Sequence, residues 1–225
     1  MSTVRVARPV TRLTSVPYDT YVRLRDARGN CGLLMAYHDG VLEIMSPQFH
    51  HETGENRLAH VIRAYCKAFD VDYEEAGSTT FRVGLPGQLK GEGKEPDASY
   101  YLRNAAAAVV GKVSLDLMLD PPPSLWIEVD NWGSSKSKIP LYAGLGIPEV
   151  WRYQARKQTL WFGRLSGDGY DEITASVALP GLTSVTVLAL IEASKPRILS
   201  TWSRWLDDVW FPEHRQELIG LGAGH

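Results

Sequence analysis

Acidic residues stand at two points of the chain where an apolar strand is expected to begin or end. Asp97 opens the run 98–102, while Glu128 and Asp130 alternate with apolar residues at the end of the run 124–130. Alternate residues of a strand point to one face, so Glu128 and Asp130 share a face. Burying carboxylates among apolar side chains is costly unless they are paired or bind a cation. The three acids therefore predict a site where a divalent metal ion activates water, as in phosphodiester hydrolysis.

Two further residues are candidates for the same site. Lys138 begins the pattern of an amphipathic helix just after the second acidic strand, although the helix dipole disfavours a cation in a first turn. We interpret it as a group that reaches over the metal, orients water and stabilises phosphate charge. Glu52, near the start of a long predicted helix, is a candidate metal or water ligand.

Simpler interpretations exist for each residue taken alone. A Pro-Asp step such as Pro96-Asp97 is commonly a turn or a cap, and Lys138 has the residue type of an ordinary solvated lysine. Glu52 is also favourable as an acid in a first helical turn. The adjacent His50 and His51 lack the i, i+4 spacing of helical zinc ligands. The case for a site depends on the acids being brought together.

Composition sets broad limits on the class of protein. The chain has 225 residues, 44% of them hydrophobic and 22% charged, as expected for one globular domain with a small appendage. Cys31 and Cys66 show neither disulfide nor metal spacing, which favours a reducing cytoplasm. The N-terminal residues show no signal peptide, and no apolar run is long enough to span a bilayer. We therefore expect a cytoplasmic protein with no membrane partner.

The net charge of −2 does not mark a nucleic-acid-binding protein, but local basic clusters could contact phosphate. One cluster lies in a predicted hairpin, where basic residues are interleaved with Trp151 and Trp161, two aromatics that we expect to be core. A second lies in, and just before, the Gly- and Lys-rich stretch 84–95, which is predicted to be a loop. The basic residues are Arg152, Arg156, Lys157 and Arg164 in the hairpin, and Arg82, Lys90 and Lys94 near the loop.

Apolar periodicity and turn residues predict an α/β protein with a mixed β-sheet core flanked by helices. The expected helices are 17–29, 47–69, 105–110, 135–145, 183–192 and 198–218, and the expected strands are 32–37, 41–46, 73–75, 79–83, 98–102, 124–130, 149–153 and 159–163. We divide the chain into a flexible arm (1–16), a main domain (17–195) and a C-terminal helical extension (196–225).

Several motifs together make the chain resemble the Uma-type restriction-endonuclease-like family, also described as a domain of unknown function, of the PD-(D/E)XK nuclease superfamily. The motifs are LEIMSP (42–47) with His51 and Glu52, GSTT (77–80), EPD (95–97) with Tyr100 and Tyr101, IEVD (127–130), KIPLY (138–142), GIPEVWRY (146–153) and LPGL (179–182). The resemblance implies a restriction-endonuclease-like core in which Asp97 and Glu128 bind metal. The superfamily places a lysine where Asp130 stands, and the resemblance implies that Lys138 replaces it.

The sequence therefore predicts a Mg²⁺- or Mn²⁺-dependent endonuclease that hydrolyses DNA, with Asp97, Glu128 and Asp130 as metal ligands and Lys138 and Glu52 as further catalytic residues. A homodimer is expected if a chain with one site is to cut both strands of a duplex. The main alternative is a catalytically silent nucleic-acid-binding or protein-interaction module with the same fold. A glycosidase ranks last, because its two carboxylates stand roughly 5–10 Å apart and acids at i, i+2 are closer.

Overall fold

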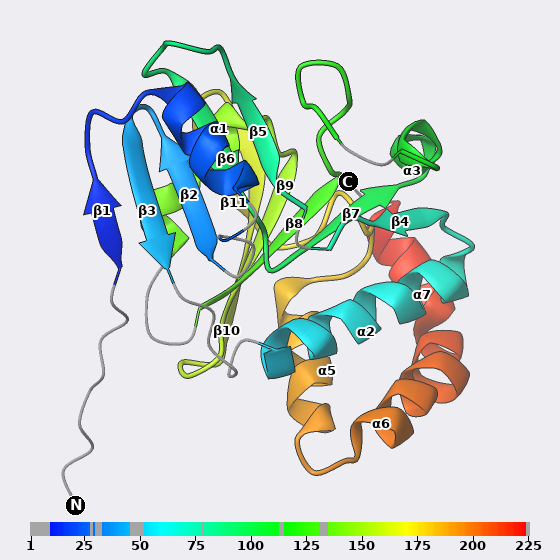
Figure 1. The fold of residues 1–225 in the computed structure, drawn as a ribbon. Coiled ribbons are helices and arrows are strands. Elements are labelled where there is room, and N and C mark those ends of the chain that lie inside the picture. Colours follow the sequence, from blue (N-terminus) through cyan, green and yellow to red (C-terminus); the bar gives the residue numbers. More distant parts are fainter. Residues whose placement is uncertain are drawn as a thin grey trace, which may run out of the picture.

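The structure is a computed structural model that describes residues 10–27, 29, 33–45, 52–77, 79–112, 115–130 and 135–223. Within these residues the strands form two β-sheets (Figure 1). The smaller sheet has the order β1 (Thr11–Leu13), β3 (Val41–Met45), β2 (Leu34–His38), β6 (Gly91–Lys94), β5 (Phe81–Gly84). The larger has the order β11 (Gly169–Ile173), β10 (Thr159–Ser166), β9 (Glu149–Gln154), β8 (Leu125–Asp130), β7 (Ala98–Leu102), β4 (Tyr73–Glu75).

The larger sheet is mixed, because β8 and β9 pair in parallel while its other neighbouring strands are antiparallel. Helical segments flank the two sheets. They are α1 (Tyr18–Asp26), α2 (Glu52–Phe69), α3 (Asn104–Val109), η3 (Ser135–Lys138), α4 (Ile139–Gly144), α5 (Ser184–Ser194), α6 (Leu199–Trp205), η4 (Leu206–Trp210) and α7 (Phe211–Gly222). The predicted α/β fold with a mixed sheet flanked by helices is confirmed.

Strand β8 is buried on both faces, and its residues divide between two cores. Leu125, Ile127 and Val129 face the core that α2 and α5 complete. Trp126 faces a second core that contains Leu141 of α4. Alternation along the strand therefore directs Glu128 to the side of Trp126, between the larger sheet and α4.

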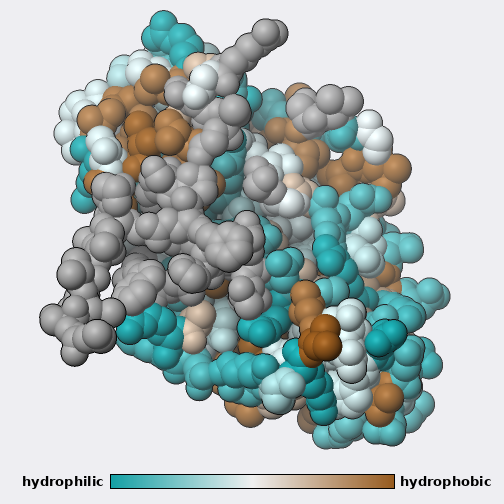
Figure 2. Space-filling model, turned by 60° about the horizontal axis from the view of Figure 1, so that its bottom comes forward, coloured by the Kyte–Doolittle hydropathy of each residue, from teal (hydrophilic) through white to brown (hydrophobic). Residues whose placement is uncertain are grey.

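The C-terminal helices share the first core with α2. Trp202, Leu206, Phe211 and Leu218 are buried in the same cluster as the apolar stripe of α2. Figure 1 shows α6 and α7 (orange to red) beside α2, and Figure 2 shows that this side of the molecule is mainly hydrophilic on its surface. The predicted extension 196–225 thus packs on the main domain through apolar side chains. No described helix is both long and apolar enough to cross a membrane.

Two segments that the sequence predicts to lack regular structure form strands in the structure. Residues 11–13, expected in the flexible arm, form the edge strand β1 against β3. Residues 91–94, expected in a loop, form β6 in the middle of the smaller sheet. Glycine is required in β6 because a Cβ at Gly93 would collide with the ring of Tyr21, which packs across the strand.

Candidate active site

Asp97, which directly precedes β7, lies beside Glu128 of the neighbouring strand β8. Ala98 of β7 stands opposite Ile127 of β8, so the antiparallel register brings Asp97 opposite Glu128, on the same face. The Val129 N–H donates to Asp97 Oδ2 at 2.6 Å, and Glu128 is buried. Burial raises the pKa of Asp97, and the adjacent Glu128 carboxylate raises it further. The structure thus brings Asp97, which is partly buried, and the buried Glu128 together as two carboxylates that repel each other.

Lys94 is the cation in direct contact with this pair. Its Nζ donates to Glu128 Oε1 at 2.6 Å and to the Glu95 carbonyl oxygen at 2.7 Å. Trp126 Nε1 also donates to Glu128 Oε1, at 2.6 Å. Lys94 is only 5% exposed, so its charge is not screened by water. The sequence indicated Lys94 only as a phosphate contact in a loop, whereas the structure places it within β6 and beside Glu128.

Lys138 lies near the same carboxylates and also near Glu43 of β3. Its side chain is 17% exposed, and its Nζ is 3.9 Å from Glu43 Oε2 on β3. Burial, and then the nearby Lys94 ammonium, lower the pKa of Lys138, while Glu128 and Asp97 act in the opposite direction. Lys138 is therefore a largely buried cation within the electrostatic reach of both acids, unlike the exposed Lys136.

Asp130 has different partners from the carboxylate pair. Its two oxygens accept from the Ser135 N–H at 2.9 and 3.1 Å, and Oδ2 also accepts from Ser135 Oγ at 3.0 Å and from Arg152 at 3.1 Å. Arg152 Nε donates in turn to Ser135 Oγ at 2.6 Å. These contacts tie the end of β8 to η3 and to the neighbouring strand β9. A metal-ligand role for Asp130 stays a prediction, and such a ligand would have to exchange some of these contacts.

Replacing Asp130 with asparagine tests which role it has. An amide keeps the shape but not the charge that Arg152 faces, so we expect Asp130→Asn to cost about 1–3 kcal/mol of unfolding free energy. We expect metal-dependent cleavage at temperatures below the transition to fall less than about 10-fold, a change of under ~1.4 kcal/mol in the barrier. Urea unfolding and cleavage rates measure the two effects. Unchanged stability with lost cleavage would instead make Asp130 a ligand.

Glu52 begins α2, but its side chain lies outside the described residues, as do His50 and His51. Gly54, in the same first turn, is packed so closely that a Cβ there would be 3.0 Å from Val129 Cγ1. Val129 points to the face of β8 opposite that of Glu128. The start of α2 thus lies on the other face of the strand, and a catalytic role for Glu52 remains a prediction.

A basic cavity lies on the same face of the larger sheet as Glu128. The parallel register sets Glu128 beside Arg152, and Arg152 stands opposite Trp161 of β10. The cavity measures about 630 Å³. Its lining contains Lys136, Ile139, Arg152, Gln154, Lys157, Thr159, Trp161, Tyr170 and Glu172. Trp151 is core, as expected, stacked on Phe162 at 4.1 Å between ring centroids, whereas Trp161 packs against the second core and also lines the cavity.

Lys94 and Arg152 are the charged partners whose contacts sequence reasoning missed. The alternation of glycine with charged residues in Gly91-Glu92-Gly93-Lys94 was the available signal, because a strand of that pattern directs Glu92 and Lys94 to one face. For Arg152 the signal was weaker, since only the parallel pairing of β9 with β8 brings it to Asp130.

Two acids brought together at adjacent strands of a mixed sheet, with lysines beside them, could hold a metal ion for phosphodiester hydrolysis. Residues 19–194 match the family Uma2, described as "Putative restriction endonuclease", and the chain belongs to that family. A solved structure from Anabaena variabilis, described as "a putative nuclease belonging to DUF820", has the same fold with a TM-score of 0.51. It is 16% identical, and the match covers 78% of this chain and 99% of that one. No curated protein matches the chain.

Proposed function

We propose that the chain is a divalent-metal-dependent endonuclease that hydrolyses DNA phosphodiester bonds at Asp97 and Glu128. The observation that carries the proposal is the register of β7 and β8, which sets the partly buried Asp97, just before β7, beside the buried Glu128 of β8. Family membership supports a nuclease, and the residues support the particular site. Carboxylates held together against their mutual repulsion are typical of metal-binding acids.

The residues fit Mg²⁺ or Mn²⁺. Both groups of the pair offer carboxylate oxygens, the ligands that these hard cations prefer. Burial and the adjacent Glu128 raise the pKa of Asp97, which means that the ionised carboxylate is destabilised in the folded chain. A bound dication would stabilise that ionised form. When bound, such an ion supplies Lewis acidity, lowers the pKa of its water and stabilises charge on the phosphoryl oxygens.

The two lysines have separate tasks in this proposal. Lys94 holds Glu128 through the contact at 2.6 Å and so fixes the orientation of one ligand. Lys138 orients the attacking water and stabilises negative charge that develops on the phosphate, because its ammonium lies within reach of the acids while remaining largely buried. Glu43, 3.9 Å from Lys138, positions that ammonium.

Replacing Lys138 with methionine should separate catalysis from metal binding. The variant keeps an unbranched apolar stem but lacks the ammonium, so we expect cleavage to fall about 10²–10³-fold, as for loss of one charge-stabilising donor. Affinity for Mn²⁺, measured by calorimetry, should change little, because Lys138 is not a ligand in this account. Unchanged cleavage would return Lys138 to the interpretation as an ordinary lysine; the matched control is Lys195→Met, at an exposed lysine of the C-terminal part of the chain.

The basic cavity supports DNA as the partner. It opens on the face that carries Glu128, and its lining has Lys136 and Lys157 as well as Arg152, which pairs with Asp130, against one acid, Glu172. Local positive charge there would allow phosphate to bind although the net charge of the whole chain is slightly negative. Cutting both strands of a duplex would require two copies of this one-site chain, and sedimentation with and without DNA tests that homodimer.

End-labelled single-stranded and duplex DNA, incubated with the protein in Mg²⁺, Mn²⁺ or EDTA, test the proposed function. We expect internal cleavage that requires metal and disappears in EDTA. The alternative, a silent binding module, predicts salt-dependent DNA binding without turnover in any metal, because phosphate contacts release counterions whether or not chemistry follows. Metal-dependent turnover rejects the silent module, and binding without turnover rejects the enzyme.

A further inference from the structure

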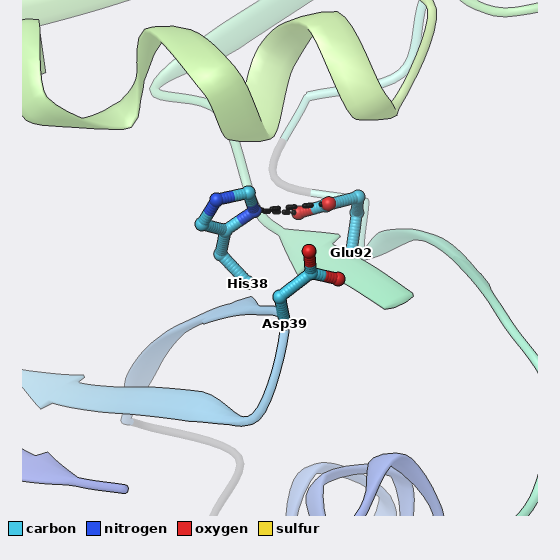
Figure 3. Close-up of side chains that lie close together, drawn as sticks. All are labelled: His38, Asp39 and Glu92. Atoms are coloured by element: carbon cyan, nitrogen blue, oxygen red, sulfur yellow. Dashed lines mark hydrogen bonds and ion pairs between the residues drawn. The ribbon is translucent and has the colours of Figure 1, made fainter. Parts of the chain in front are cut away.

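A second group of ligand-type side chains lies at the end of β2. His38 stands opposite Glu92 of β6 in the antiparallel register, and Asp39 follows it as the first residue of the turn. Asp39 has a left-handed backbone (φ 41°), which turns the chain sharply after the strand. Figure 3 shows the three side chains drawn close together, and one ligand atom from each lies within 4.8 Å of the others.

The spacing of these atoms suits a single ion. His38 Nδ1 is 2.9 Å from Glu92 Oε1 and 2.8 Å from Oε2. With metal–ligand bonds of about 2.1 Å, neighbouring ligands of one ion are separated by roughly 3 Å and opposite ones by roughly 4.2 Å. The imidazole and the Glu92 carboxylate thus already stand at the separation of neighbouring ligands. Asp39 would complete the set, because one of its carboxylate oxygens lies within 4.8 Å of the ligand atoms of His38 and Glu92.

Burial of Glu92 gives a reason of its own for a cation. The residue is 7% exposed, and its side chain is covered by α4 so closely that a Cβ at Gly144 would be 2.6 Å from Glu92 Cγ. Burial raises the pKa of Glu92 to about 7, although the contact with His38 acts in the opposite direction and Asp39 adds to the rise. A carboxylate held under a helix beside a second acid is stabilised by positive charge.

Access from solvent completes the argument. The His38 side chain is 41% exposed and Asp39 is exposed, so an ion could enter from the turn side while Glu92 closes the site from beneath. Glu92 and Lys94 lie on the same face of β6, but Glu92 contacts His38 whereas Lys94 contacts Glu128, so the cluster has a different set of partners from the Asp97–Glu128 pair.

We infer that His38, Asp39 and Glu92 bind one divalent transition-metal ion that fastens the β2–β3 turn to β6 beneath α4. One imidazole with two carboxylates suits Zn²⁺, Mn²⁺ or Co²⁺ better than Mg²⁺, which prefers oxygen ligands alone. The ion is structural in this account and independent of the proposed nuclease activity. It links a turn to β6, which lies between β2 and β5 in the smaller sheet.

Cobalt binding to the full-length chain tests the inference without any nuclease assay. The chelator-treated Asp97→Asn/Glu128→Gln double variant, which lacks the carboxylate pair, is titrated with Co²⁺ and followed by visible absorbance. We expect one Co²⁺ per chain with d–d bands, and a melting temperature that rises with added Zn²⁺. His38→Gln in the same background should weaken Co²⁺ binding at least 10-fold, whereas His60→Gln, a histidine of α2 beside Ser203, should leave it unchanged.

Absence of Co²⁺ binding to the double variant, or binding that survives His38→Gln unchanged, would overturn the inference. If circular dichroism shows that His38→Gln is misfolded, Asp39→Asn replaces it, because asparagine tolerates the left-handed backbone and keeps an oxygen for the Gly91 N–H at 3.2 Å while it removes the charged ligand. A weakened titration with Asp39→Asn supports the site, and an unchanged one rejects it. The Co²⁺ titrations do not depend on nuclease activity, so a failure of the proposed nuclease function would leave their interpretation unchanged.

Discussion

Asp97→Asn is expected to reduce metal-dependent cleavage by at least about 10³-fold, because it removes one of the two charged ligands of the ion that activates water. The fold should survive the change. An asparagine side chain has the same shape, and its carbonyl oxygen can accept the hydrogen bond that the Val129 N–H now donates to Asp97. Cleavage rates with saturating Mg²⁺ measure the loss.

The same variant should be more stable than the wild type when no metal is present. Burial, and then Glu128, raise the pKa of Asp97 in the folded chain above its unfolded value. A carboxyl whose pKa is higher in the folded chain contributes its full share of the unfolding free energy at a pH below its pKa in the unfolded chain. That contribution is lost as the pH rises through its pKa in the folded chain. Asp97→Asn should therefore gain about 1–3 kcal/mol over the wild type in EDTA at pH 8 and nothing at low pH.

Thermal melts across pH, in EDTA, check the stability effect, and Asp116→Asn on the exposed segment before Asp120 serves as the matched control. A variant that cuts as fast as the wild type would remove Asp97 from the site. A variant that is less stable than the wild type at pH 8 would show that Asp97 holds the fold together rather than straining it.

Lys94→Met is expected to have the largest effect on stability. It leaves the Glu128 carboxylate buried without the ammonium that now donates to it at 2.6 Å. Removing one partner of a buried ion pair typically costs about 3–5 kcal/mol, because the remaining charge is uncompensated. Urea unfolding of the metal-free protein, with the exposed Lys195→Met as control, measures the cost.

The double variant Lys94→Met/Glu128→Gln separates the charge from the packing. Without the carboxylate no buried charge is left unpaired, so most of the lost free energy should return. A Lys94→Met variant that is as stable as Lys195→Met would contradict the structure's placement of Lys94 beside Glu128. Failure of the double variant to recover would mean that Lys94 acts through its apolar stem.

The carboxylate pair could be anticipated because the local pattern of the sequence is strong. Two carboxylates alternate with Ile127 and Val129 in a run too apolar for the surface, and the alternation alone fixes which face they share. That Asp97 stands opposite Glu128 depends on the register of two strands about thirty residues apart, which the sequence does not encode locally. The sequence therefore predicts that Asp97 and Glu128 belong to one site, but it does not predict that they stand directly opposite each other.

The surrounding charges were harder to place for a physical reason. Strand β6 is built from glycines and charged residues, so it lacks the apolar alternation by which strands are recognised, and its burial comes from Tyr21 packing on Gly93. Lys94 was therefore assigned to a loop. The pairing of Asp130 with Arg152 likewise needs β9 to lie parallel beside β8, a tertiary arrangement that no spacing in the chain reveals.

Nicking of supercoiled plasmid by the wild type and by the Asp97→Asn/Glu128→Gln double variant tests the central claim most directly. The account predicts that the wild type converts supercoiled DNA to open circles in Mg²⁺ or Mn²⁺ but not in EDTA. Glu128→Gln also removes the carboxylate partner of Lys94, so circular dichroism first establishes that the double variant is folded at the assay temperature. The account predicts that the folded double variant cuts at least about 10³-fold more slowly. Equal nicking by both proteins would contradict the assignment of the site, and no metal-dependent nicking by the wild type would contradict the proposed activity.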